Sequence, residues 1–200
     1  MQIFLKLFLT ILFFSALLFS CDDDPVAVPK PRGYPKIIFP KRAYQPFDKD
    51  YCNLVFEYPT YAQIQKHDNF LGEQQKNDCW FDIFVPQFDA KIYCTYSPIN
   101  QETTLEKLKN DAFELAQKHN IKAKYIEEIK IATPNGVHGF AFNLEGEVAS
   151  PLQFYLTDDT NNFIRGSLYF NSEVAPDSLA PALDFLKKDV EHMINTLKFN

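Results

Sequence analysis

The chain has 200 residues, with 20 Lys and Arg against 26 Asp and Glu, so its formal net charge is −6. This acidic balance argues against nucleic acid as a partner, because neutralising phosphates requires a basic face. The length allows one compact domain with its own hydrophobic core, preceded by an N-terminal leader.

The N-terminus has the parts of a bacterial lipoprotein signal. Lys6 precedes an apolar run over residues 7–19, and Ser20 and Cys21 follow it. A basic start, a short apolar stretch and a small residue before the cut are typical of a secretory signal. We predict a signal peptide over residues 1–20 and acyl chains on Cys21, which would hold the mature chain on a membrane.

The alternative for this leader is an uncleaved anchor helix, since about 20 residues can span a bilayer. The apolar core is shorter than that and ends at a small residue followed by a cysteine. This favours the lipoprotein signal.

Residues 21–46 are predicted to form a tether. Six prolines interrupted by basic residues disfavour a helix and favour an extended, polyproline-like segment: Pro25, Pro29, Pro31, Pro35, Pro40 and Pro46. A docking strip for a partner is the alternative, and Tyr34 or Phe39 could instead contact the domain itself. The remaining residues, 47–200, are predicted as a single domain.

Two helices are predicted in this domain. Thr103 and Glu106 have the spacing of a capping box at the start of a helix over residues 103–119. An apolar stripe predicts the terminal helix over residues 178–197, in which Pro181 fits only the first turn and His192 lies on the exposed side. Residues 63–78 are predicted as loop with some helix. Strands are predicted over 53–58, 80–85, 91–96, 124–132, 137–144, 152–157 and 163–170.

This order predicts an α+β fold, in which an antiparallel β-sheet of about six strands is flanked by helices. The order of elements resembles the α/β sandwich shared by the photosystem protein PsbP and the nuclear transport factor Mog1. Similarity of element order carries no function with it.

Motifs of known catalytic chemistry are missing from the sequence. With six glycines, it has no phosphate-binding glycine loop, no nucleophile elbow and no zinc-protease motif. We therefore predict no catalytic residues, no cofactor and no metal. Two weaker hypotheses are acid–base chemistry at His138 and calcium binding in the turn at 158–161, which turn formation explains more simply.

Three cysteines follow Cys21, namely Cys52, Cys79 and Cys94. An oxidising compartment permits one disulfide among them and leaves one thiol over. Cys79 and Cys94 could pair across a hairpin, whereas Cys52 and Cys79 would close the segment between them and contribute about 3 to 4 kcal/mol. The residues alone leave both pairings open.

Characteristic segments run along nearly the whole mature chain: Pro29–Tyr34, Tyr44–Asp48, Phe56–Ala62, Cys79–Ile83, Gln153–Asp158, Phe163–Phe170, Asp177–Leu179 and Leu186–Asp189. Together these segments resemble the gliding-motility lipoprotein family GldD. The family's cysteines correspond to Cys21, Cys52 and Cys79, so the resemblance favours a Cys52–Cys79 bridge. Cys94 departs from the family pattern.

The resemblance implies an envelope lipoprotein required for gliding in bacteria that also use type IX secretion, with no assigned reaction. We therefore expect a non-enzymatic adaptor, lipid-anchored and facing the periplasm or the outer surface, whose partners are other gliding and secretion proteins. Its binding surface is predicted at an exposed aromatic patch or sheet edge involving Arg165 or the flanks of Tyr61 and Trp80.

Two alternatives remain from the sequence. A small-ligand or lipid-binding envelope protein would need an apolar cavity between sheet and helix. An envelope hydrolase would need a cleft that brings His138 beside a carboxylate or Cys94.

Overall fold

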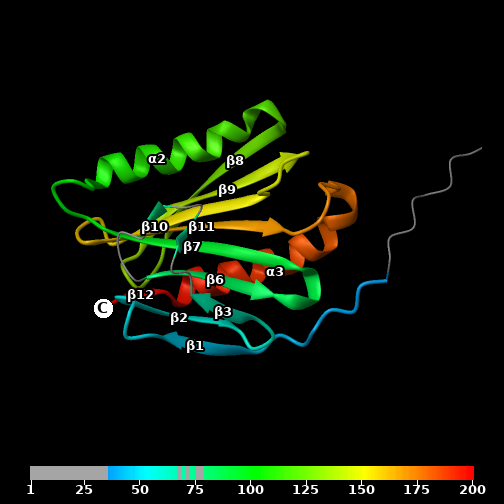
Figure 1. Cartoon of the computed structure of the whole chain (residues 1–200), viewed down its shortest axis with the longest axis horizontal. Helices are drawn as coiled ribbons and strands as arrows, with labels where there is room; N and C mark the ends of the chain where they lie inside the picture. The colour runs from blue at the N-terminus through cyan, green and yellow to red at the C-terminus, as the bar shows by residue number, and fades with distance from the viewer. Residues whose placement is uncertain (1–35, 67–68, 71–72, 75–78) are drawn as a thin grey trace, which may run out of the picture. The chain divides into compact units, whose positions relative to one another are not determined.

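Antiparallel sheets form the framework of the domain. The computed structural model describes residues 36–66, 69–70, 73–74 and 79–200. The larger sheet has the order β3 (Gln63–Lys66), β6 (Trp80–Val85), β7 (Ala90–Pro98), β11 (Asn162–Phe170), β10 (Leu152–Thr157), β9 (His138–Gly146), β8 (Ala123–Ala132) (Figure 1). A smaller sheet has the order β1 (Tyr44–Asp48), β2 (Leu54–Pro59), β12 (Lys198–Phe199), and β4 (Asn69–Phe70) pairs with β5 (Glu73–Gln74).

The two long helices lie on opposite faces of the large sheet. Helix α2 (Leu105–Gln117) buries Ala112 and Ala116 against aromatic side chains of β9, β10 and β11. Helix α3 (Pro176–Thr196) packs on the other face, between the large sheet and the small one (Figure 1). The short helices η2 (Pro86–Phe88) and η3 (Lys118–Ile121) connect β6 to β7 and α2 to β8. The predicted α+β fold is confirmed.

The centre of the large sheet is covered on both faces. All six residues of β10 are buried, so Phe154 faces α3 while Tyr155 faces α2. The ring of Phe154 lies across Gly166 on the paired strand β11, where a Cβ atom would meet ring carbons at 2.1 to 2.7 Å. Only glycine leaves room for this ring.

The body of the domain begins before the boundary inferred from the proline pattern. Lys36–Asn200 groups as one compact unit, and β1 already begins at Tyr44 and pairs with β2. Phe39 stacks on Phe185 of α3 at 4.8 Å between ring centroids. Pro46 is accommodated because β1 is an edge strand, where a missing N–H is tolerated.

Several short elements differ from the prediction. Six of the seven predicted strands join the large sheet, but β3 adds a seventh strand where loop with some helix was expected, and β1 and β12 were not predicted. These segments have two to five residues and are too short to show a clear hydrophobic period.

The helix ends also differ in detail. The N-cap of α2 is Thr104, whose Oγ accepts from the backbone N–H of Lys107 at 3.3 Å, whereas Thr103 donates to the carbonyl of Pro98. Helix α3 begins at Pro176, two residues early, so Pro181 lies in its second turn. His192 is half-buried rather than exposed, because its ring stacks on Tyr44 at 3.6 Å between centroids.

Candidate functional site

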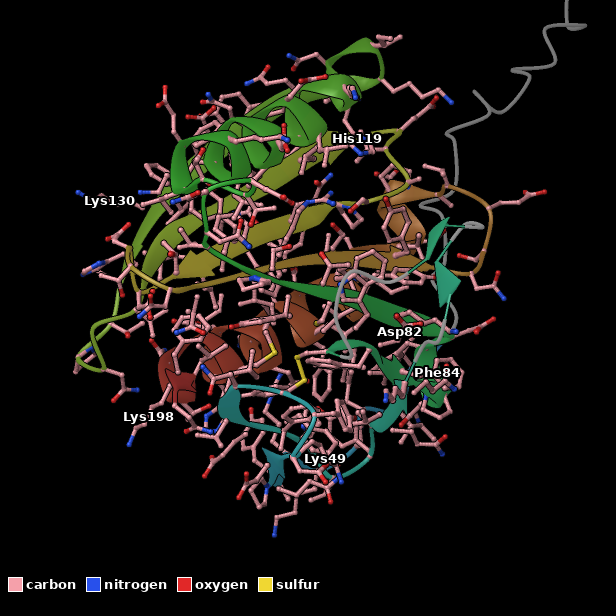
Figure 2. All side chains as sticks on the ribbon, turned by 60° about the vertical axis from the view of Figure 1, so that its left-hand side comes forward. Lys49, Asp82, Phe84, His119, Lys130 and Lys198 are labelled. Carbon is pink, nitrogen blue, oxygen red and sulfur yellow. A yellow bond between two sulfur atoms is a disulfide. The ribbon has the colours of Figure 1, made fainter. Side chains whose placement is uncertain are left out.

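A disulfide joins the segments that lead into the two sheets. Cys52 and Cys79 are bonded, which is the pairing implied by the family resemblance (Figure 2). Cys52 precedes β2 of the small sheet, and Cys79 precedes β6 of the large sheet. Cys94 on β7 is a buried free thiol, and burial raises its pKa, so it is a packing residue and not a reactive one. Cys21 lies outside the described residues.

Asp189 on α3 is a buried carboxylate that holds the N-terminal segment. Its Oδ1 accepts from Arg42 Nε at 3.1 Å and from the Tyr44 hydroxyl at 3.0 Å, and its Oδ2 accepts from the Tyr61 hydroxyl at 2.5 Å. The guanidinium of Arg42 also lies 4.0 Å from the ring centroid of Phe185. We call Arg42, Tyr44, Tyr61 and Asp189 the Asp189 cluster.

The hydroxyls of the two tyrosines in this cluster remain hydrogen-bond donors at neutral pH. Burial, with the hydrogen bond to Asp189 as the second cause, raises the pKa of Tyr44 to about 12 and raises the pKa of Tyr61 further. Both hydroxyls therefore stay protonated and donate to the carboxylate at neutral pH. The cluster fixes the chain to α3 a few residues after the start of the folded body, which is a structural role.

His138 does meet a carboxylate, in a hollow between α2 and the sheet. Its Nδ1 lies 2.8 Å from Asp159 Oδ2, and Lys109 Nζ lies 2.8 Å from Asp159 Oδ1. The hollow has a volume of about 380 Å³ and is also lined by Lys130 and Thr157. We call it the His138 hollow.

Among the described residues that line the His138 hollow, the aliphatic hydroxyl is that of Thr157. The Thr157 hydroxyl donates to the carbonyl of Asn162 at 2.7 Å, so it is not aimed at His138. Cys94 belongs to the core on the α3 side of the sheet. Thr157 is the strand partner of His138, and its side chain lies on the same face as that of Tyr155, which faces α2. Cys94 and His138 are therefore on opposite faces of the sheet. Within the described residues, His138 lies beside a carboxylate, and neither the Thr157 hydroxyl nor the Cys94 thiol is directed at it as acyl transfer would require.

Asp158 in the β10–β11 turn makes the hydrogen bonds that close the turn. Asp158 Oδ1 accepts the backbone N–H groups of Thr160, Asn161 and Asn162 at 2.9 to 3.0 Å. Burial tends to raise the pKa of Asp158, but these hydrogen bonds and one from the Asn162 side chain outweigh it and lower the pKa to about 2. Within the part of the chain that the structure describes, no His, Cys, Asp and Glu side chains gather as a metal site.

The residues expected to form an exposed binding surface are engaged in the fold. Arg165 is half-buried and donates to Gln153 Oε1 at 3.1 Å, and burial lowers its pKa. Trp80 donates from Nε1 to the carbonyl of Tyr96 at 3.2 Å, and Tyr61 donates to Asp189. None of the three forms an open patch in the described region.

The open apolar surface lies instead where the sheet extends beyond α3. A groove of about 430 Å³ runs between β8, β9 and α3. We call it the α3 groove. Ile129, 40% exposed, and Ile131 line it from β8, and Val190 and Ile194 line it from α3. Such an apolar surface at a sheet edge is suited to contact with another molecule.

A second hollow adjoins the α3 groove at Lys187, which lines both. It has a volume of about 330 Å³ and lies between the start of α3 and the β9–β10 connection. Its apolar side chains include Val148, Leu183 and Val174, the last 45% exposed. The two hollows together therefore follow much of the length of α3.

Comparison with known families decides the identity of the chain. Residues 24–199 match the family model of the gliding motility lipoprotein GldD. The chain belongs to this family. The GldD match begins just after the predicted lipidation site and continues to the end of β12, so it includes the Asp189 cluster, the disulfide and the α3 groove.

Among solved structures, this GldD-family chain is similar to the solution structure of cyanobacterial PsbP (CyanoP) from Synechocystis sp. PCC 6803. The identity is 12%, the TM-score is 0.47, and the match covers 85% of this chain and 99% of that chain. A search of curated proteins finds no match.

Membership in the GldD family implies association with the cell envelope through a lipid. Among the residues that the structure describes, no helix is long and apolar enough to cross a membrane.

Proposed function

We propose that this chain is a lipid-anchored, non-enzymatic adaptor of the gliding-motility and type IX secretion machinery. Cys21 would carry the acyl chains, residues 22–35 would act as a tether, and the domain would contact other envelope proteins on the periplasmic or outer side. The family match is the observation that supports the gliding role.

The α3 groove is the contact surface that we propose for this adaptor. Its lining includes apolar side chains of β8, β9 and α3. Ile129 on β8 is exposed there, whereas Ile131 packs partly against the core that contains Val190 and Ile194. The exposure of Ile129 indicates apolar area available for burial, which drives association at about 25 cal/mol per Å² of apolar surface.

The proposed function is tested in a strain that lacks the gene. Colony spreading and secretion of type IX cargo are measured separately, with the wild-type gene and a Cys21→Ala gene returned to the strain. We expect loss of both activities in the deletion, full restoration by the wild type and little restoration by the unlipidated variant. Normal spreading and secretion by the deletion strain would refute the proposal.

A second candidate function is the binding of a small apolar ligand or a lipid, because the α3 groove lies between sheet and helix with a volume in the range of ligand sites. The exposed apolar side chain of this groove is Ile129 on the edge strand β8, whereas Val190 and Ile194 are buried, and this arrangement suits a protein partner at the sheet edge better than an enclosed ligand. Mass spectrometry of an organic extract of the purified domain separates the two functions, since a stoichiometric lipid would favour the carrier.

A further inference from the structure

The large sheet has one long open edge. Strand β8 ends the sheet and, among the described residues, pairs only with β9, whereas the opposite edge strand β3 has four residues. The register of β8 is irregular between Ala123 and Tyr125 and regular from there to Ala132. A regular edge strand presents a row of backbone N–H and C=O groups that can pair with another chain.

A hollow flanks this edge on each face of the sheet. Lys130, Ile131 and Ala132 line both the α3 groove on one face and the His138 hollow on the other. Successive side chains of a strand point to opposite faces. Ile129 pairs with Ala141 and belongs to the α3 side, whereas Lys130 pairs with Phe140, which packs on α2. Figure 2 shows Lys130 at the outer margin of the sheet, beside α2.

We infer that β8 receives an extended strand of a partner protein, which continues the large sheet by one strand. A strand added about 4.8 Å beyond β8 would place alternate side chains in the α3 groove and the intervening ones in the His138 hollow. The inference rests on the proposed adaptor function and names its mode of contact.

The two hollows determine the chemistry of the partner strand. The α3 groove offers an apolar floor of Ile129, Ile131, Val190 and Ile194. The His138 hollow gathers the cations Lys109 and Lys130 and the imidazole of His138 around one carboxylate, Asp159. The partner strand therefore alternates apolar side chains, directed toward α3, with acidic side chains, directed toward α2.

The test is photo-cross-linking of the full-length lipoprotein in its own cells. A photoreactive benzoyl-phenylalanine replaces Ile129 or Lys130, and the captured residues are identified by mass spectrometry. We expect both probes to capture one segment of one other protein, at residues that differ by an odd number of positions. A probe at the exposed Asn110 on α2 is the control and captures nothing from that segment.

A charge change tests the acidic side chains of the partner. Lys130→Glu should lower the yield from the Ile129 probe about tenfold, because it places like charges together in the His138 hollow. Lys107→Glu, at an exposed position near the start of α2, should leave the yield unchanged.

Three results would overturn the inference. Captured residues an even number of positions apart, or in different segments, would show that the partner is not an added strand. Capture of β8 of a second copy would show self-association, and no captured protein would remove the contact. The adaptor function is judged separately from the deletion strain, so failure of the added strand is distinguishable from failure of the adaptor function.

Discussion

Asp189→Ala is expected to lower the free energy of unfolding by about 3 kcal/mol. The carboxylate is 3% exposed and accepts hydrogen bonds from Arg42, Tyr44 and Tyr61. Removing one partner of a buried ion pair leaves the other without compensation, which costs about 3 to 5 kcal/mol, and the partial exposure of Arg42 places the cost near the lower value. The melting temperature should fall by roughly 10 °C.

Asp184→Ala is the matched control for this change, because Asp184 lies on the same helix and is exposed. It should change the free energy of unfolding by less than about 0.5 kcal/mol. Equal melting temperatures for the two variants, read by circular dichroism, would mean that the Asp189 cluster does not hold the N-terminal segment on α3.

Removal of the disulfide is the second large change, and the double variant Cys52→Ala/Cys79→Ala should lose about 3.5 kcal/mol. The bond joins residues separated by 27 positions, and a cross-link that closes a loop of this length restricts the unfolded chain. Urea unfolding of the oxidised domain and of the variant measures the difference. Both cysteines are replaced together because a single replacement would leave a thiol that could pair with Cys94.

The wild-type domain in reductant is the first control and should unfold at the same urea concentration as the double variant. Cys94→Ala in the oxidised domain is the second control and should keep the stabilisation from the disulfide, because the Cys94 thiol is free. An unfolding midpoint that reductant leaves unchanged would contradict this role of the disulfide.

The sequence predicts the long elements of this fold well. The six residues 152–157 form a continuous strand because both of its faces are covered, and the apolar stripe of α3 is read directly from its spacing. The family resemblance points to the disulfide through the correspondence of Cys52 and Cys79. These features depend on local periodicity or on residues that the family shares.

The Asp189 cluster could not be predicted in the same way. From the helix sequence alone, Asp189 would be assigned to the solvent-exposed face. Its partners Arg42 and Tyr61 lie 147 and 128 residues away along the chain, so the helix sequence does not reveal them. Neither periodicity nor spacing reveals which distant donors a carboxylate will meet. The proline pattern also does not show where the folded domain begins, because prolines are compatible with an edge strand as well as with an extended tether.

The α3 groove depends on where α3 crosses the sheet, which the sequence does not specify. Ile129 and Ile131 were predicted as strand residues, but the pattern does not show that Ile129 is exposed while Ile131 packs partly against the core. Arg165 was predicted at the binding surface, but periodicity does not show whether a charged side chain within a strand meets solvent or a neighbouring strand. Its hydrogen bond to Gln153 shows that such a residue can be held by the sheet itself.

The central claim is tested most directly by returning the gene with Ile129→Glu to the deletion strain and measuring colony spreading. Ile129 is half-exposed, so the charge should disturb contact at the α3 groove with little effect on folding, which an unchanged melting temperature and protein level would verify. Ile121→Glu, at a 93% exposed isoleucine outside the groove, is the control. The account predicts that the gene with Ile121→Glu restores spreading and the gene with Ile129→Glu does not. Normal spreading by a strain whose Ile129→Glu protein is folded and normally abundant would contradict it.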